Sequence, residues 1–180
     1  FDGWDANGRP VGKPWAEVRT PLVQFAAVNE EQTRNAFDPL LEMLRQGPVL
    51  DYYDIDPMET FVALPKGRIE YITAAATSKE GAKPVFAALD QTEGWIRSNG
   101  GVNLAAVLRR NAGKIGGTTI ETPNAYRPGM GSVSEATAEY HASIKEGRAR
   151  EEGLLYDHRE APSDTDMADK DSLYKGLLHV

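Results

Sequence analysis

The stretch KPVFAALDQTEGW, residues 83–95, decides the fold of this 180-residue chain. Its apolar part is short and nearly continuous, which is typical of a strand that a parallel sheet buries on both faces. A second run, PLVQFAAV (residues 21–28), has the same character, and GTTIET (residues 117–122) returns as a strand. Segments with helical spacing separate these runs. The sequence therefore predicts an α/β fold, a three-layer sandwich around a mainly parallel sheet.

The helix expected after residues 21–28 begins at once. Asn29 is a capping residue, and Gln32 stands where a capping box needs it. Pro39 interrupts the helical pattern, so we expect the helix to kink there or to restart with Asp38 as its cap. The apolar residues of this pattern recur at helical spacing and predict its buried face: Phe37, Leu40, Leu41 and Leu44.

The rest of the chain is assigned in smaller pieces. Two strand patterns separated by PKG, at residues 60–64 and 68–75, predict a hairpin. Helical patterns follow at residues 102–112 and 133–146. GLLYDH, residues 153–158, predicts one more strand. We expect residues 1–20 to be a polar loop or insertion and residues 21–162 to form the α/β domain. The acidic residues 163–180 are expected to be a linker or the start of a following segment.

Composition excludes several classes of protein. The chain is 41% hydrophobic and 26% charged, which is typical of a globular domain and excludes wholesale disorder. No window approaches the roughly 20 apolar residues that a membrane span needs. The chain has no cysteine, which excludes disulfides and thiolate metal sites and fits a reducing compartment. Its net charge of −7 argues against a broad nucleic-acid-binding surface but allows local basic contacts.

Asp90 and Glu93 are the residues that first suggest chemistry. In nucleotide-hydrolysing α/β proteins, an aspartate at the carboxyl end of a buried strand holds Mg²⁺, and a nearby glutamate polarises the attacking water. Asp90 has that position, and Glu93 follows closely. The pattern alone is weak, because Asp90 would equally cap the next turn.

Other candidate sites fail on spacing. GRPVGKPW (residues 8–15) is not a phosphate-binding loop, because its glycines are too close together and Pro14 replaces the Ser or Thr that binds Mg²⁺. The three histidines show no metal-ligand spacing. The acidic cluster at residues 51–56 lacks the glycine and distal glutamate of a calcium loop. Ser132 is better explained as a helix cap than as a nucleophile.

Four stretches in order along the chain resemble the ATPase domain of phage large terminase subunits, the motors that pump DNA into procapsids. They are VQFAAVNEEQTRNAF, SKEGAKPVFAALDQTEGW, GGTTIETPNAYRPGMGSVSE and GLLYDHREAP, and they cover most of residues 21–162. The resemblance implies a P-loop NTPase core of the ASCE or RecA-like type that binds ATP and Mg²⁺. It implies that Asp90 is the Mg²⁺-associated carboxylate and that Thr122 and Asn124 sense the γ-phosphate and couple its loss to movement.

The same resemblance gives weaker roles to residues earlier in the chain. Asn29 and Gln32 would lie at a strand-to-helix corner that related translocases point toward nucleic acid, and their alternative role is to cap the helix. The family usually has glutamate directly after the Mg²⁺ aspartate, whereas Gln91 stands there in this sequence. A glutamine can orient water but cannot take its proton, so either Glu93 takes over the general-base or water-orienting role, which we expect, or hydrolysis is slow. Gln91 stays a catalytic candidate beside Asp90 and Glu93.

The phosphate-binding loop and the nuclease domain of the family have no counterpart in this sequence, and the chain opens at Phe1 without a methionine. We therefore expect a core truncated on its N-terminal side, a fragment that is inactive alone. The resemblance implies double-stranded DNA, the small terminase subunit and the portal protein as partners, a homo-oligomeric ring, no membrane contact, and action in the host cytoplasm. Two alternatives stay open: a nucleotide-independent α/β binding or scaffold module, and another helicase-like ATPase.

Overall fold

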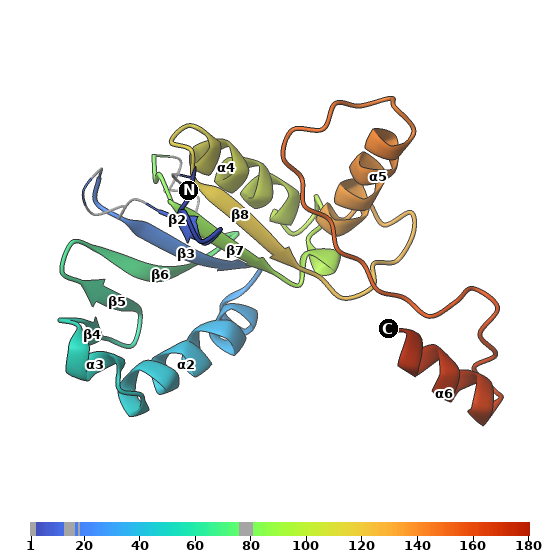
Figure 1. Ribbon diagram of the computed structural model, residues 1–180, viewed down its shortest axis with the longest axis horizontal. Helices are drawn as coiled ribbons and strands as arrows, with labels where there is room; N and C mark the ends of the chain where they lie inside the picture. Colours follow the sequence, from blue (N-terminus) through green and yellow to red (C-terminus); the bar gives the residue numbers. More distant parts are fainter. Residues whose placement is uncertain (1–2, 13–16, 18, 76–80) are drawn as a thin grey trace. The chain divides into compact units, whose positions relative to one another are not determined.

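A mixed sheet is the main feature of the first of two compact units in the chain. The computed structural model describes residues 3–12, 17, 19–75 and 81–180, and the chain divides into two compact units, Phe1–Ala138 and Glu139–Val180. In the described part of the first unit, six strands pair in the order β4-β5-β6-β3-β7-β8 (Figure 1). They are β3 (Leu22–Ala27), β4 (Asp56–Pro57), β5 (Phe61–Leu64), β6 (Gly67–Thr73), β7 (Phe86–Asp90) and β8 (Thr118–Thr122).

Strand direction confirms the expectation of a mainly parallel sheet. β6, β3, β7 and β8 run parallel, while β5 and β4 are added antiparallel at one edge. The hairpin expected from residues 60–75 is present as β5 and β6. Residues 78–80 of the loop expected before β7 lie outside the described residues.

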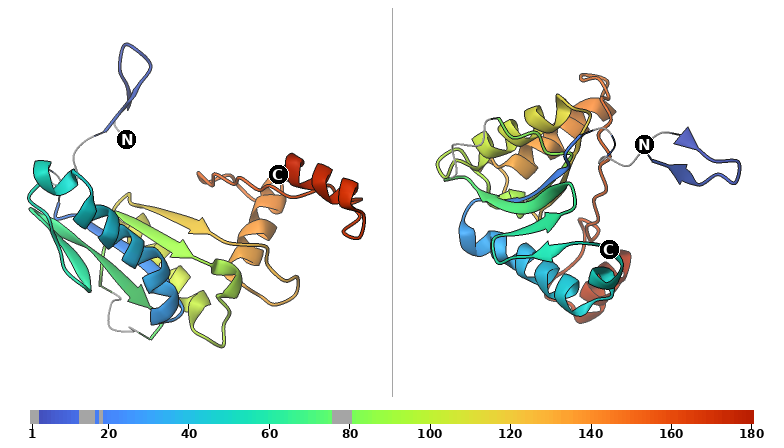
Figure 2. Two further views of the ribbon diagram at one scale, coloured as in Figure 1. Left: turned by 90° about the horizontal axis from the view of Figure 1, so that it is seen from below. Right: turned by 90° about the vertical axis from the view of Figure 1, so that its left-hand side faces the viewer.

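Helix α2 (Glu30–Gln46) covers one face of the sheet (Figure 2). Its Phe37 and Leu41 are buried with Val62, and the rings of Phe25 and Tyr71 meet Phe37 edge-on at centroid distances of 6.3 and 5.3 Å. The helix is continuous through Pro39, so the restart at Asp38, one of the two alternatives expected, is wrong. Pro39 is exposed, which lets water satisfy the carbonyl that loses its backbone donor.

Helix α4 (Gly101–Gly113) covers the opposite face. Ala105 and Leu108 from this helix pack with Ala26, Leu89 and Trp95 in a second core cluster. Ala26 and Phe25 are neighbours on β3 and face opposite sides, as the two-residue repeat of a strand requires. Helices on both faces explain why the central strands are apolar almost throughout.

The amino-terminal segment contains a hairpin of two short strands, β1 (Gly3–Trp4) and β2 (Pro10–Val11). Residues 13–15 of the rejected phosphate-loop pattern lie outside the described residues. The acidic region before β5 forms a short helix, α3 (Val49–Tyr52), and then strand β4.

Helix α5 (Val133–Lys145) begins in the first unit with a capping box. Glu135 N–H donates to Ser132 Oγ, and the Glu135 carboxylate accepts the N–H groups of Gly129 and Gly131 at 2.5 and 2.6 Å. The N–H of Gly129 contributes most to lowering the pKa of Glu135; burial opposes the shift, and the N–H groups of Gly131 and Ser132 add to it. This carboxylate fixes the loop between β8 and α5.

The second unit holds the rest of α5, an irregular segment, and α6 (Lys170–His179). The strand expected at residues 153–158 is absent from the described structure, where these residues are irregular. Tyr156 instead stacks on His141 with ring centroids 4.2 Å apart. Residues 163–180, expected as a linker, include α6, whose N-cap Asp169 accepts from Ser172 N.

Candidate functional site

Asp90 and Thr122 end neighbouring parallel strands and lie together. Asp90 is the last residue of β7 and Thr122 the last of β8, and the two are direct partners in the strand register. Thr122 Oγ1 donates a hydrogen bond of 2.9 Å to Asp90 Oδ1. Asp90 is half-buried and Thr122 exposed, so the pair is accessible at the carboxyl edge of the sheet. This is the edge at which open α/β sheets bind ligands.

The turn after Asp90 has an unusual backbone. Gln91 adopts φ 55° and ψ 46°, the left-handed region, and among the described residues no other non-glycine residue has positive φ. Its N–H donates to Thr122 O at 3.2 Å. This conformation costs a non-glycine residue about 1–2 kcal/mol, so the surrounding contacts must hold it.

Two contacts hold this turn in place. The indole N–H of Trp95, a fully buried residue, donates to Asp90 O at 2.9 Å. Gly101, at the start of α4, packs so closely that a Cβ there would lie 2.6 Å from Trp95 Cβ. The turn is therefore locked between β7 and the start of α4.

Glu93 and Asn124 form a second pair beside the first. Glu93 lies in a short 3₁₀ helix, Thr92–Gly94, and Asn124 follows β8. The Asn124 N–H donates to Glu93 Oε2 at 3.1 Å, and Asn124 Nδ2 donates to Glu93 Oε1 at 2.9 Å. Both carboxylate oxygens of Glu93 are thus engaged by one residue. The structure brings together four of the residues singled out in the sequence, Asp90, Glu93, Thr122 and Asn124.

Asn29 and Gln32 lie apart from these pairs, just after β3. Asn29 Oδ1 accepts from Gln32 N at 2.9 Å, and Thr33 Oγ1 donates to Asn29 O, so Asn29 caps α2. The Gln32 side chain does not complete the capping box, and its buried Oε1 has no hydrogen-bond partner in the described structure. β3 is the strand next to β7, so this cap is at the same edge of the sheet as Asp90.

Glu121 is a supporting residue that the sequence did not single out. It lies one residue before Thr122, with a side chain that is 15% exposed. The fully buried Thr92 donates to Glu121 Oε2 at 3.3 Å, Thr137 of α5 donates to it at 3.2 Å, and Arg109 of α4 forms an ion pair with Oε1. Glu121 therefore ties the turn after β7 to two helices. The signal available in the sequence was Glu121 itself, an acidic residue inside the predicted strand GTTIET, where burial would require a polar partner.

The donor set at the carboxyl edge fits a magnesium ion held with phosphates. Among the described residues, no three acidic or histidine side chains stand close enough for a metal site made by protein alone. Mg²⁺ in nucleotide sites needs only one or two carboxylates, since waters and phosphate oxygens supply its other ligands. Asp90 offers such a carboxylate, with Thr122 bonded to one of its oxygens.

Comparison with known proteins was made by sequence and by structure. No family model matches the sequence. The Gene 13 proteins of Mycobacterium phages L5 and D29 are 31% and 30% identical to the chain over 176 residues. The large terminase of bacteriophage HK97 matches the structure with a TM-score of 0.67, at 16% sequence identity, over 90% of this chain.

This chain has the fold of part of a phage large terminase. The resemblance expected from the sequence is thereby confirmed at the level of the fold. The chain spans 33% of the HK97 terminase and 29% of each Gene 13 protein. In the described residues of this terminase-like chain, no helix has the length and apolarity to cross a bilayer.

Proposed function

We propose that this chain is part of the ATPase domain of a large terminase, the subunit that uses ATP to package double-stranded DNA into phage procapsids. The pairing of Asp90 with Thr122, at the carboxyl ends of adjacent strands in a terminase-like sheet, carries the proposal. The sequence similarity to two phage proteins supports a phage origin.

Asp90 would hold Mg²⁺ through its carboxylate, which the Thr122 hydroxyl holds in place. When bound, the ion neutralises charge on the phosphates of ATP. Thr122 fixes the Asp90 carboxylate through its hydroxyl. A movement of Asp90 on loss of the γ-phosphate would therefore change this hydrogen bond at the end of β8. That connection supports a coupling role for Thr122.

Glu93 would orient the attacking water and accept its proton. The amide of Gln91 is not a base, whereas the carboxylate of Glu93 can act as one. Asn124 donates one hydrogen bond to each Glu93 oxygen, which fixes the direction of the carboxylate and leaves a lone pair on each oxygen for the proton of a water. We propose that Asn124 orients Glu93 in this way, which links the residues after β8 to the base and gives Asn124 a coupling role of its own.

The phosphate-binding loop would come from residues outside these 180. In the described sheet β8 pairs on one side only, and Ile120 in this strand is 47% exposed. Parallel sheets are ordinarily buried, so an exposed apolar residue on a strand with one unpaired edge indicates that further chain covers it. We propose that the strand carrying the phosphate-binding loop joins the free edge of β8, beside Asp90 and Thr122.

The remaining roles follow from membership in such a motor. The intact protein would act on double-stranded DNA as a homo-oligomeric ring, with the small terminase subunit and the portal protein as partners. It would work in the host cytoplasm. Asn29 and Gln32, at the same edge of the sheet, would form the corner that faces DNA, although the structure gives Asn29 a capping role.

Nucleotide binding by the isolated 180-residue chain tests the placement of the phosphate-binding loop. We expect ATP with Mg²⁺ to bind weakly, with a Kd of about 1 mM or more, because the backbone cradle and lysine of such a loop are missing. Isothermal titration calorimetry measures this directly. Micromolar binding would show that the chain holds a complete phosphate site and would contradict the proposal.

The assignment of the base is tested in the full-length protein. Glu93→Ala is expected to lower ATP hydrolysis by about 100-fold or more, the range for loss of a general base, with ATP binding retained. Gln91→Ala, the control next to Asp90, is expected to keep most of the hydrolysis rate. If Glu93→Ala hydrolyses ATP at the wild-type rate, Glu93 is not the base.

A further inference from the structure

A pocket of about 630 Å³ lies at the amino-terminal edge of the parallel strands, opposite to the edge that carries Asp90. Leu22 begins β3, Gly67 begins β6, and Lys83 precedes β7; all three line the pocket. Arg19 and Arg68 line it as well. Three cationic side chains from three separate segments therefore line one pocket at this edge.

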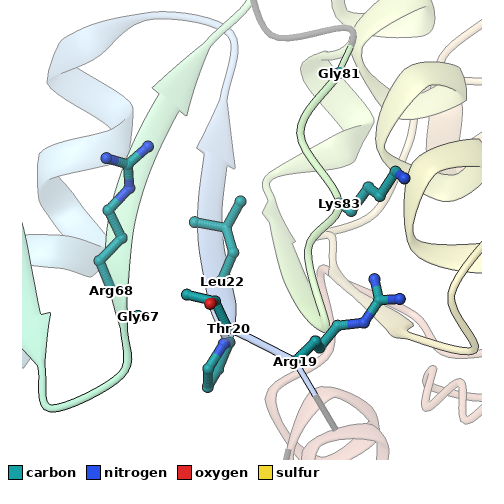
Figure 3. A pocket seen from close by; sticks show the side chains of 8 residues that line it. Arg19, Thr20, Leu22, Gly67, Arg68, Gly81 and Lys83 are labelled. Carbon is teal, nitrogen blue, oxygen red and sulfur yellow. The ribbon is translucent and has the colours of Figure 1, made fainter. Parts of the chain in front are cut away.

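The cations of this basic pocket, Arg19, Arg68 and Lys83, are incompletely neutralised. Arg68 Nε lies 2.9 Å from Glu70 Oε2. For Arg19 and Lys83, no carboxylate of the described residues lies within ion-pair distance. Figure 3 shows Arg19 and Lys83 extending to the same side of β3, with Arg68 on the other side of Leu22. In a chain of net charge −7, this is a local excess of positive charge.

Arg19 also has an unused donor. Its Nε is buried and has no hydrogen-bond partner among the described residues. Leaving a buried donor unpaired is unfavourable, and for a charged group the cost is higher. Because the Nε is closed to solvent, an anion from outside the chain would be held by the terminal N–H groups of the same guanidinium together with the charge of Lys83.

Phosphate is the anion that best fits this set of donors. A guanidinium donates in a planar fork that matches two oxygens of a phosphate, and an ammonium adds a point charge. We propose that the basic pocket binds a phosphate group, from either a small phosphate compound or a nucleic-acid backbone. The proposal is independent of the ATPase assignment, because it concerns the other edge of the sheet and none of the same residues.

The test uses the 180-residue chain and two probes at low salt. One is a short fluorescent DNA duplex followed by anisotropy, and the other is inorganic pyrophosphate followed by calorimetry. The pocket variant is Arg19→Gln with Lys83→Gln, which removes the two unpaired cations and keeps the Arg68–Glu70 pair. Arg34→Gln with Lys175→Gln is the charge-matched control, on the surfaces of α2 and α6. Circular dichroism and Tm check that each variant is folded.

We expect the pocket variant to raise Kd by about tenfold or more and the control by less than about twofold, because lost phosphate contacts act locally. For DNA, the slope of log K against log salt should also fall by about two, roughly 0.9 per contact. An effect on the DNA probe alone identifies the backbone as the ligand, and an effect on pyrophosphate identifies a small phosphate compound. Equal weakening by the pocket and control variants, or binding of neither probe by the wild type, would overturn the proposal.

Discussion

Asp90 and Thr122 meet because two parallel strands end in the same register. Asp90 is the partner of Thr122 in the β7–β8 ladder, and the hydroxyl-to-carboxylate bond follows from that position. Glu93 and Asn124 are each a few residues further along, and their bidentate contact needs both this alignment and the 3₁₀ helix that carries Glu93. Gln91, the residue with left-handed backbone that follows Asp90, sets the direction of the chain toward Glu93.

Substitutions at Gln91 test whether the left-handed turn is as constrained as its contacts indicate. Gln91→Val should destabilise the fold by about 1–2 kcal/mol relative to Gln91→Gly, because a β-branched side chain clashes in the left-handed region and glycine does not. Urea unfolding of the two variants measures the difference. Equal stability of the valine and glycine variants would mean that residue 91 leaves this conformation readily.

At the scale of elements, Glu121 connects β8, α4, α5 and the turn after β7. Most of the contribution of Glu121 to the free energy of unfolding should come from its hydrogen bond with the buried Thr92 hydroxyl. The Arg109 side chain is 40% exposed, so its ion pair with Glu121 is screened by water.

We therefore expect Glu121→Ala to lower the free energy of unfolding by about 1–3 kcal/mol, the range for a buried polar group left unpaired. Arg109→Gln, which removes only the exposed partner, should cost less than about 1 kcal/mol. Denaturant unfolding of both variants, with Thr92→Val as the third, measures the coupling. If Glu121→Ala and Arg109→Gln cost the same small amount, Glu121 does not hold the turn.

For the molecule as a whole, the sequence predicted the parts that tertiary packing buries. Both faces of the sheet are covered, so β3 and β7 are apolar runs that could be predicted as strands. The same burial made it possible to predict the helical stripe with Phe37 and Leu41. The neighbouring ends of β7 and β8 follow from the parallel arrangement of the strands. The pairing of Glu93 with Asn124 could not be predicted from the sequence, since it depends on the short 3₁₀ helix that follows Gln91.

The carboxyl-terminal residues were less predictable for a physical reason. In α6 the apolar residues Leu177 and Leu178 are exposed and Gly176 is buried, so no apolar stripe marks the helix. GLLYDH contains a short apolar run like that of a strand, but Leu155 is 93% exposed and these residues pair with no strand in the described structure. Local pattern without a partner sheet does not make a strand.

The central claim, that the carboxyl edge of this sheet is an ATPase site, is tested most directly by ATP hydrolysis in the full-length protein with Asp90→Asn. The account predicts a loss of about 100-fold or more in the hydrolysis rate, because a neutral amide cannot replace a carboxylate beside Mg²⁺ and phosphate charge. Asp51→Asn, on the exposed surface of α3, is the matched control and should hydrolyse ATP at the wild-type rate. A folded Asp90→Asn protein with wild-type hydrolysis would contradict the account.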